Sequence, residues 1–298
     1  MLKRLFLLCI FLCLMVCPIK VLSNHLIKYP PSKIILSEIK LDSILLNVLY
    51  LFNQRIDNKQ DIKIRSDTMV LSIGNDWSIY YDWNRKKRDS ISGRNLAMDP
   101  VYRNISLRVN PEELQARFDM NELVYHLADA SKGESAKIFK LRSEKKIITI
   151  DDHSDIFYRL QEQPLFHEWI ITNDTLTILD YVCQNALTEF RGRIYSVWFT
   201  TDIPINEGPW KLYGLPGMIL KAEDSEKIFC FEAIGLNKVK DQFINMVNSK
   251  NIVVCENFHQ LQKVRQNRFR HVFYGFVEGG NLVYYPSNNP IELIELEK

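Results

Sequence analysis

Glycine and proline are scarce in this chain, and the short motifs of common enzymes are missing from it. There are only 11 of each residue among 298. The sequence contains no GxSxG, HExxH, GxGxxG or P-loop pattern and no CxxC pair, which removes the usual signatures of serine hydrolases, zinc peptidases and nucleotide-binding folds. Low-complexity tracts and internal repeats are also absent. The remaining composition predicts an ordinary globular protein.

The N-terminus has the pattern of a secretory signal. Lys3 and Arg4 precede an unbroken apolar run from Leu5 to Cys17, which Pro18 ends. A membrane-spanning helix needs about 20 apolar residues, and this run is too short. We therefore expect residues 1–23 to be a signal peptide cleaved near Ser23, and the mature chain to be exported to the periplasm or outer membrane without a transmembrane segment.

Neither charge nor cysteine content points to a specific partner. Residues 1–23 contain three of the 38 basic residues and no acid, so the mature chain has 35 basic against 36 acidic residues. No basic field remains for nucleic acid. Only Cys183, Cys230 and Cys255 follow residue 23. One disulfide with one buried thiol, or no disulfide, is compatible with this odd number.

The most unusual segment runs from Tyr195 to Asp224 and combines Trp198, Pro204, Trp210, Pro216 and three glycines. Its centre reads Gly214-Leu215-Pro216-Gly217-Met218-Ile219. Proline followed by glycine predicts a type II turn, because proline sets φ at the second position and glycine accepts a positive φ at the third. Gly214 and Gly217 also let another backbone or a ligand come close.

Two interpretations of this segment follow. In the first, it is a bend between layers of sheet, covered by Trp198 and Trp210. In the second, it lines a groove for an apolar or extended ligand, because such sites are typically apolar and aromatic. The candidate ligand-binding residues are then Trp198, Trp210, Gly214, Leu215, Pro216 and Gly217.

The order of motifs from His167 to Leu236 resembles a known family. Trp169-Ile170, Tyr181 to Ala186, Tyr195 to Thr200 and Ile203 to Lys211 precede the glycine-proline centre, and Tyr285 to Leu293 is similar to the family's ending. The chain resembles the GLPGLI family, exported proteins of Gram-negative bacteria that are mostly of unknown function. It departs from the family pattern at Met218, where leucine is usual, and at Tyr213, where a small residue is usual. The resemblance implies an extended, tyrosine-bearing strand over Leu45–Ile56.

Strand patterns dominate the chain. Residues 60–73 alternate with a break at Ser66-Asp67, and Trp77–Trp83 is an aromatic strand. Further strands are expected at 137–141, 145–150, up to 171, from 176 after a turn at Asn173-Asp174, and at 192–203, 210–214, 217–224 and 226–236. Residues 274–285 predict a hairpin turning at Gly279-Gly280. We expect a β-rich α+β fold, an antiparallel meander forming a curved open sheet or half-barrel.

One or two helices are expected to pack against this sheet. Asn110, Pro111 and Glu113 form a good helix start and predict a helical insertion around 110–130. A second helix is expected over Glu256–Arg268. Residues 24–298 are interpreted as a single domain, with the arrangement of 24–130 left open.

Candidate catalytic groups are sparse. Asp151, Asp152 and His153 form the one dense acid and histidine cluster, and Asp202 and Glu207 flank the glycine-proline segment. Polar turns account for these side chains as well as a metal or a carboxylate pair would. No catalytic residue, metal or cofactor is therefore assigned, and Cys183 is interpreted as a buried thiol rather than a nucleophile.

Three functional hypotheses remain. The first is non-enzymatic binding of a lipid, a hydrophobic peptide or an outer-membrane protein by an exported cell-envelope protein. The second is an assembly role, in which a sheet edge pairs with another chain. The third is an envelope hydrolase that uses the loop carboxylates.

Overall fold

The structure is a computed structural model and describes residues 37–58, 61–87, 133–153, 156–163, 166–270, 274–278 and 281–285. These residues belong to one compact unit, Leu36–Lys298. The predicted signal peptide and the predicted helix at 110–130 lie outside the described residues. None of the helices in the described part is long and apolar enough to cross a membrane.

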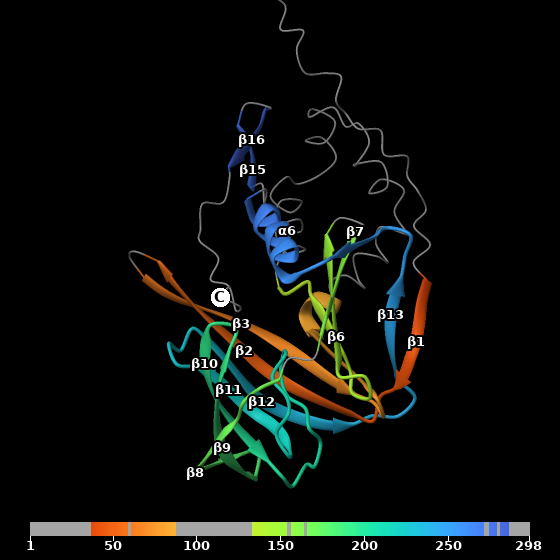
Figure 1. The fold of residues 1–298 in the computed structure, drawn as a ribbon. Coiled ribbons are helices and arrows are strands. Elements are labelled where there is room, and N and C mark those ends of the chain that lie inside the picture. Colours follow the sequence, from red (N-terminus) through yellow and green to blue (C-terminus); the bar gives the residue numbers. More distant parts are fainter. Residues whose placement is uncertain are drawn as a thin grey trace, which may run out of the picture. The chain divides into compact units, whose positions relative to one another are not determined.

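A twelve-stranded sheet dominates the fold (Figure 1). Its spatial order is β14-β7-β6-β5-β4-β3-β2-β12-β11-β10-β9-β8. Neighbouring strands are antiparallel except β14 and β7, which are parallel. The sheet is open, because β14 and β8 form its two edges. The first seven strands in the chain order of this sheet are β2 Leu46–Asn58, β3 Asp61–Ile73, β4 Trp77–Asp82, β5 Lys137–Leu141, β6 Lys146–His153, β7 Ile156–Glu162 and β8 Ile170–Ile178.

The C-terminal half of the sheet returns to the N-terminal half through β12, which pairs with β2. Residues 83–87, directly after β4, are helical. The remaining elements are β1 Ser37–Ser43, β9 Tyr181–Phe190, β10 Arg193–Thr200, β11 Met218–Asp224, β12 Phe229–Lys238, β13 Phe243–Asn248, β14 Ile252–Cys255, α6 Phe258–Arg270, β15 Tyr274–Glu278 and β16 Asn281–Tyr285. The last two strands form the predicted hairpin.

The central strands are buried on both faces. Successive side chains of a strand point to opposite faces, and on β3 Met69 and Leu71 join one hydrophobic cluster while Val70 joins another. The larger cluster, which also contains Tyr50, Tyr195 and most apolar residues of β9 to β12, fills one face. On the other face, the antiparallel pair β1–β13 brings Ile244 and Met246 against β4 to β6. This two-sided burial explains why β2 and β3 are rich in apolar residues.

Helix α6 follows the edge strand β14 and packs on β7. Leu261 is buried with Leu160 and Cys255. Asn257 caps the helix, since its side-chain oxygen accepts a hydrogen bond from the backbone N–H of Gln260 at 3.0 Å. The predicted second helix is therefore confirmed, beginning two residues later than expected.

The fold class is confirmed as a β-rich, open, largely antiparallel sheet with a helix packed on it. Three local predictions are wrong. The turn predicted at Asn173-Asp174 lies at Leu179-Asp180, both at positive φ, and the register shift between Ile171 and Thr175 absorbs the two polar residues as a bulge inside β8. The break predicted at Ser66-Asp67 is continuous strand. Residues 210–214 form no strand.

Candidate functional site

The segment between β10 and β11, residues 201–217, packs into the larger hydrophobic cluster. Trp210, Leu212 and Leu215 are buried in it, and Trp198 and Tyr213 pack against it. Although β10 and β11 are paired antiparallel neighbours, 17 residues separate them. The segment therefore contributes buried side chains to the core, while others of its residues are exposed.

The type II turn predicted around Pro216-Gly217 is wrong, because Gly217 does not have a positive φ and Gly214 has a φ of 107°. Gly217 is required for another reason. A Cβ atom there would lie 2.0 Å from the carbonyl oxygen of Thr200 at the end of β10. The expected close backbone approach is thus confirmed at Gly217, and it is an internal contact.

A buried ion pair joins this segment to the sheet. Glu207 is 1% exposed, and its carboxylate lies 2.5 Å from the Nζ atom of Lys140 on β5. The Ser78 hydroxyl on β4 donates a hydrogen bond to the same carboxylate at 2.8 Å. Lys140 also donates to the carbonyl oxygen of Gly208 at 3.1 Å. Glu207 therefore anchors the segment to the sheet. Its carboxylate is already bound by Lys140 and Ser78, whereas a catalytic carboxylate would have to be free to contact a substrate.

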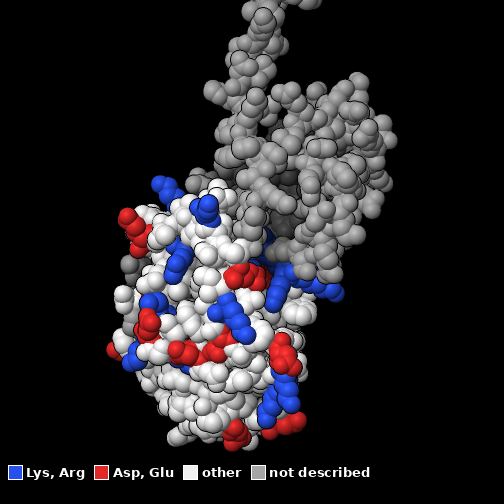
Figure 2. Space-filling view, turned by 90° about the vertical axis from the view of Figure 1, so that its right-hand side faces the viewer, with Lys and Arg blue, Asp and Glu red and all other residues white. Residues whose placement is uncertain are grey.

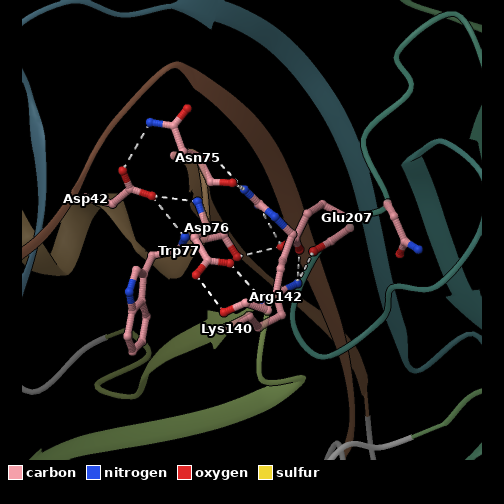
Figure 3. A network of polar contacts seen from close by, with 12 residues as sticks. Asp42, Asn75, Asp76, Trp77, Lys140, Arg142 and Glu207 are labelled. Carbon is pink, nitrogen blue, oxygen red and sulfur yellow. Dashed lines mark hydrogen bonds and ion pairs between the residues drawn. The ribbon is translucent and has the colours of Figure 1, made fainter.

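Figure 3 shows how Arg142 links this pair to the turn that contains Asn75 and Asp76. The Nη1 atom of Arg142 lies 3.5 Å from Glu207, and its Nη2 atom donates to the carbonyl oxygens of Gly74 and Asn75. In the same turn, Asp42 accepts hydrogen bonds from the backbone N–H groups of Asp76 and Trp77 at 2.7 and 3.0 Å. These backbone donors hold the pKa of the Asp42 carboxyl below its usual value, although burial opposes them.

A second buried pair lies beside Trp210. The Nζ atom of Lys211 is 2.7 Å from the Glu162 carboxylate on β7, and Arg191 lies 2.6 Å from the same carboxylate. Lys211 is 2% exposed. The adjacent residues Trp210 and Lys211 thus have different partners: Trp210 packs in the larger hydrophobic cluster, and Lys211 forms an ion pair with Glu162.

His167 fixes the backbone of the same segment. Its Nε2 atom donates to the Lys211 carbonyl oxygen at 2.9 Å, and its ring contacts Phe190, Trp169 and Tyr213. Burial, together with the charge of Lys140, lowers the pKa of His167 to about 4, against the opposing effect of the Lys211 hydrogen bond. The imidazole is therefore neutral at pH 7.

We expect His167 to make the fold sensitive to acid. Because its pKa is lower in the folded protein than in the unfolded chain, its contribution is complete above about pH 6.5 and is lost as pH falls towards about 4. Over that window the free energy of unfolding should fall with a slope of up to about 1.4 kcal/mol per pH unit from this group. Urea unfolding at pH 7, 6, 5 and 4 measures the slope.

The matched comparison is His167→Gln, which keeps an amide donor for the Lys211 carbonyl but does not titrate. The difference between the wild-type and variant slopes isolates the histidine from carboxylates that titrate in the same range. Equal slopes would show that His167 is not the acid-sensitive group.

A pocket lies on the face of the sheet that carries the larger cluster, and α6 forms one wall. It measures about 540 Å³ including its open mouth, and about 50 Å³ when only the space for centres of water molecules is counted. The apolar part of its lining comes from strands β2, β3, β5 and β12, from the residue before β5, from the 201–217 segment and from α6. These residues are Phe52, Met69, Ala136, Ile138, Trp210, Phe231, Phe258 and Leu261.

The pocket also has polar lining residues. Glu134, Lys211 and Arg265 contribute charged side chains. Tyr80 on β4 and Thr149 on β6 also line it, and the hydroxyl oxygens of both are buried without a hydrogen-bond partner. Buried polar groups normally have partners, so these two hydroxyls mark the pocket as a place where a polar group of a ligand would be stabilised.

The acidic cluster predicted near Asp151 does not converge. Asp151 is buried and accepts hydrogen bonds from Ser135 and from Nε of Arg265, at 2.5 and 2.6 Å. Asp152 pairs with Arg85 at 3.1 Å. Asp202 is exposed, whereas Glu207 is buried. In the described ranges, no three His, Cys, Asp or Glu side chains form a potential metal site.

Cys183, Cys230 and Cys255 are free thiols in the described part of the chain. Cys183 and Cys255 are buried, and burial raises the pKa of Cys183 to about 11. A thiol with a raised pKa is a poor nucleophile, in keeping with the interpretation of Cys183 as packing.

The structure thus divides the six predicted ligand-binding residues. Trp210 lines the pocket. Trp198 is half-buried against the larger cluster, Leu215 and Gly217 are buried, and Gly214 and Pro216 are exposed. The other pocket residues were not predicted from the sequence. Their aromatic and apolar side chains come from separate strands and from α6, and the only signal in the sequence was the abundance of such residues.

Comparison with known proteins gives one matching family model, described as "N-glycanase peptide, N-terminal domain", over residues 112–259. That is 148 residues, just under half of the chain. No curated protein matches. The resemblance to the GLPGLI family stays a prediction.

A solved structure of PNGF-II is similar in fold. The structure in space group P21 has a TM-score of 0.50 and 13% sequence identity, and the match covers 76% of this chain and 34% of that one. The structure in space group C2 has a TM-score of 0.49 and 15% identity, covering 78% and 35%. The chain therefore spans about a third of the length of these neighbours. At 13% identity, the similarity to the structure in space group P21 concerns the fold alone.

Proposed function

We propose that this protein binds a partly apolar ligand without transforming it, and that the pocket under α6 is the binding site. The observation that carries the proposal is the combination of an aromatic lining with two buried, unpartnered hydroxyl groups. Ligand sites are typically apolar with a few placed polar groups. The loop carboxylates considered for a hydrolase support this choice, since Glu207 is held in a buried pair and Asp202 is exposed.

We also propose that binding takes place in the bacterial cell envelope. The basic and apolar N-terminus and the resemblance to exported GLPGLI proteins support this location. On the face shown in Figure 2, acidic and basic side chains of the described residues are interspersed. No field of one sign forms there, which favours a neutral or apolar ligand over nucleic acid.

The test is native mass spectrometry of the mature protein purified from a bacterial periplasm without detergent. We expect a reproducible added mass that is reduced in Phe258→Ala, which opens the wall formed by α6. The matched control is Phe243→Ala on β13, a partly exposed phenylalanine that does not line the pocket. An apo mass in wild type, or an adduct that both variants retain, would exclude the pocket as the site.

The matching family model favours a second candidate. Its description names an N-glycanase, so the chain is a candidate accessory module for a protein that acts on N-glycans. This candidate predicts that a glycopeptide binds more tightly than the same peptide after removal of its glycan. Equal affinities by isothermal titration calorimetry would exclude it. An assembly role through the β8 edge, in turn, predicts oligomers in the same mass spectra.

A further inference from the structure

The two unpartnered hydroxyls belong to one row across the sheet. Tyr80 on β4 is directly opposite Ile138 on β5, and Ile138 is directly opposite Thr149 on β6. All three side chains line the pocket. Neighbouring strands lie about 4.8 Å apart, so Tyr80 and Thr149 flank Ile138 at a backbone separation of about 10 Å. The two side chains therefore lie on the same face of the sheet, on either side of Ile138.

Both hydroxyls are buried and unpartnered. Tyr80 is 3% exposed and Thr149 is 4% exposed, and neither hydroxyl has a partner in the described structure. The ring of Tyr50 contacts the ring of Tyr80 edge to face, with centroids 6.5 Å apart. The Tyr50 hydroxyl donates a hydrogen bond to the carbonyl oxygen of Ile219 at 2.7 Å. The neighbouring buried tyrosine is thus satisfied within the protein, whereas Tyr80 is not.

The walls of the pocket suit a flat ring. The rings of Phe52 and Phe231 are stacked with centroids 4.9 Å apart, and Trp210 and Phe258 complete the aromatic lining. Aromatic pairs with centroids 4.5 to 7 Å apart are favourable beyond their buried area. The space open to the centres of water molecules is about 50 Å³, a few times the roughly 10 to 15 Å³ that one water molecule needs. A compact ligand therefore suits this space better than a long acyl chain.

The charged side chains of the pocket already have partners. Lys211 is paired with Glu162 at 2.7 Å, and Arg265 is paired with Asp151 at 2.6 Å and with Glu134. A ligand carboxylate or ammonium group would compete with these pairs. The uncommitted polar groups on the sheet side are neutral hydroxyls, which match a neutral group that both donates and accepts a hydrogen bond.

Resting on the proposed binding function, we infer that the pocket binds a neutral aromatic ring that carries one hydroxyl group. The ligand hydroxyl accepts a hydrogen bond from one of Tyr80 and Thr149 and donates to the other, while its ring lies among Phe52, Phe231 and Trp210. A free phenolic molecule and a tyrosine side chain of a peptide share this chemistry.

The experiment compares p-cresol with toluene by ligand-detected NMR titration of the mature protein. The two probes have similar shape and differ by the hydroxyl. We expect p-cresol to bind about 10-fold or more tightly, since a hydrogen bond of typical strength contributes about 3- to 10-fold and two are formed. Tyr80→Phe and Thr149→Val remove one protein hydroxyl each and should each reduce the p-cresol preference about 3- to 10-fold.

The matched control is Tyr81→Phe, the same substitution at a buried tyrosine on the opposite face of β4, which should leave the preference unchanged. Thermal unfolding of all variants confirms that they are folded. Equal binding of toluene and p-cresol, or an unchanged preference in Tyr80→Phe, would overturn the inference and leave apolar binding intact.

Two further measurements distinguish a free phenol from a peptide tyrosine, and the phenolic ligand from the proposed binding function. N-acetyltyrosinamide binding more tightly than p-cresol identifies a peptide side chain, and the reverse order identifies a free phenol. If neither probe binds while the periplasmic protein carries an aliphatic adduct, the phenolic assignment fails and the binding function stands. If neither probe binds and no adduct is found, both proposals fail.

Discussion

Replacing Glu207 with alanine is expected to lower the free energy of unfolding by about 3 to 5 kcal/mol, the usual effect of removing one partner of a buried ion pair. Lys140 would remain as a buried, uncompensated charge, and the Ser78 hydroxyl would lose its acceptor. Urea unfolding followed by tryptophan fluorescence measures the change. This substitution separates an anchoring carboxylate from a catalytic one, because an anchor affects stability first.

Two comparisons make the result specific. Asp202→Ala, at the exposed carboxylate of the same segment, should change the free energy of unfolding by less than about 0.5 kcal/mol. The double variant Lys140→Met with Glu207→Leu should recover a large part of the loss, because hydrophobic residues of similar size often replace a buried pair without cost. A loss below about 1 kcal/mol in Glu207→Ala would contradict the anchoring role.

The second large effect is expected for Gly217→Ala. The added methyl group would lie 2.0 Å from the Thr200 carbonyl oxygen and 2.6 Å from its carbon. Both are backbone atoms at the end of β10, so the strand itself has to move. Overpacking of this kind costs roughly 1 to 3 kcal/mol and occasionally more, and we expect about 3 kcal/mol here because no flexible side chain can absorb the contact. Thermal and urea unfolding measure it.

Gly235→Ala is the matched control for this substitution. Gly235 lies in β12 at a register shift, and a Cβ atom there would meet nothing within 4 Å. Alanine is favoured over glycine inside a strand by roughly 0.5 to 1 kcal/mol, so this variant should be unchanged or slightly more stable. A similar loss of unfolding free energy in both variants would contradict the explanation that the close contact with Thr200 requires glycine at position 217.

The sequence predicted the elements whose signals are local. Alternating residues and tight turns gave the hairpin of β5 and β6, and the strands β10, β11 and β12, within a few residues. The failures arose where tertiary contacts outweigh local preference. Asn173-Asp174 has the composition of a turn but forms a bulge, because the chain reverses at Leu179-Asp180 instead. Residues 210–214 were predicted as a strand because they are mostly apolar. These apolar side chains are buried or half-buried, but the residues form a loop that packs into the larger cluster.

The candidate site was only partly accessible from the sequence. Trp210 was selected for its neighbourhood to the glycine-proline motif, and it does line the pocket. Tyr80 and Thr149 carry no local signal, since a tyrosine or threonine in a strand is ordinary. Their significance lies in the missing partner of each hydroxyl, and that becomes visible only when β4, β5 and β6 are placed side by side.

The pairing of β12 with β2 has a kinetic consequence. Phe52 is opposite Phe231, 179 positions later in the chain, and Ser37 is opposite Asn248. Contacts between such distant positions slow folding, because the loop between them must close before the contacts stabilise it. Until β12 has been synthesised, β2 has an unpaired edge. Nascent or truncated forms therefore expose an apolar strand edge, and the sheet can be completed only after synthesis has passed residue 238.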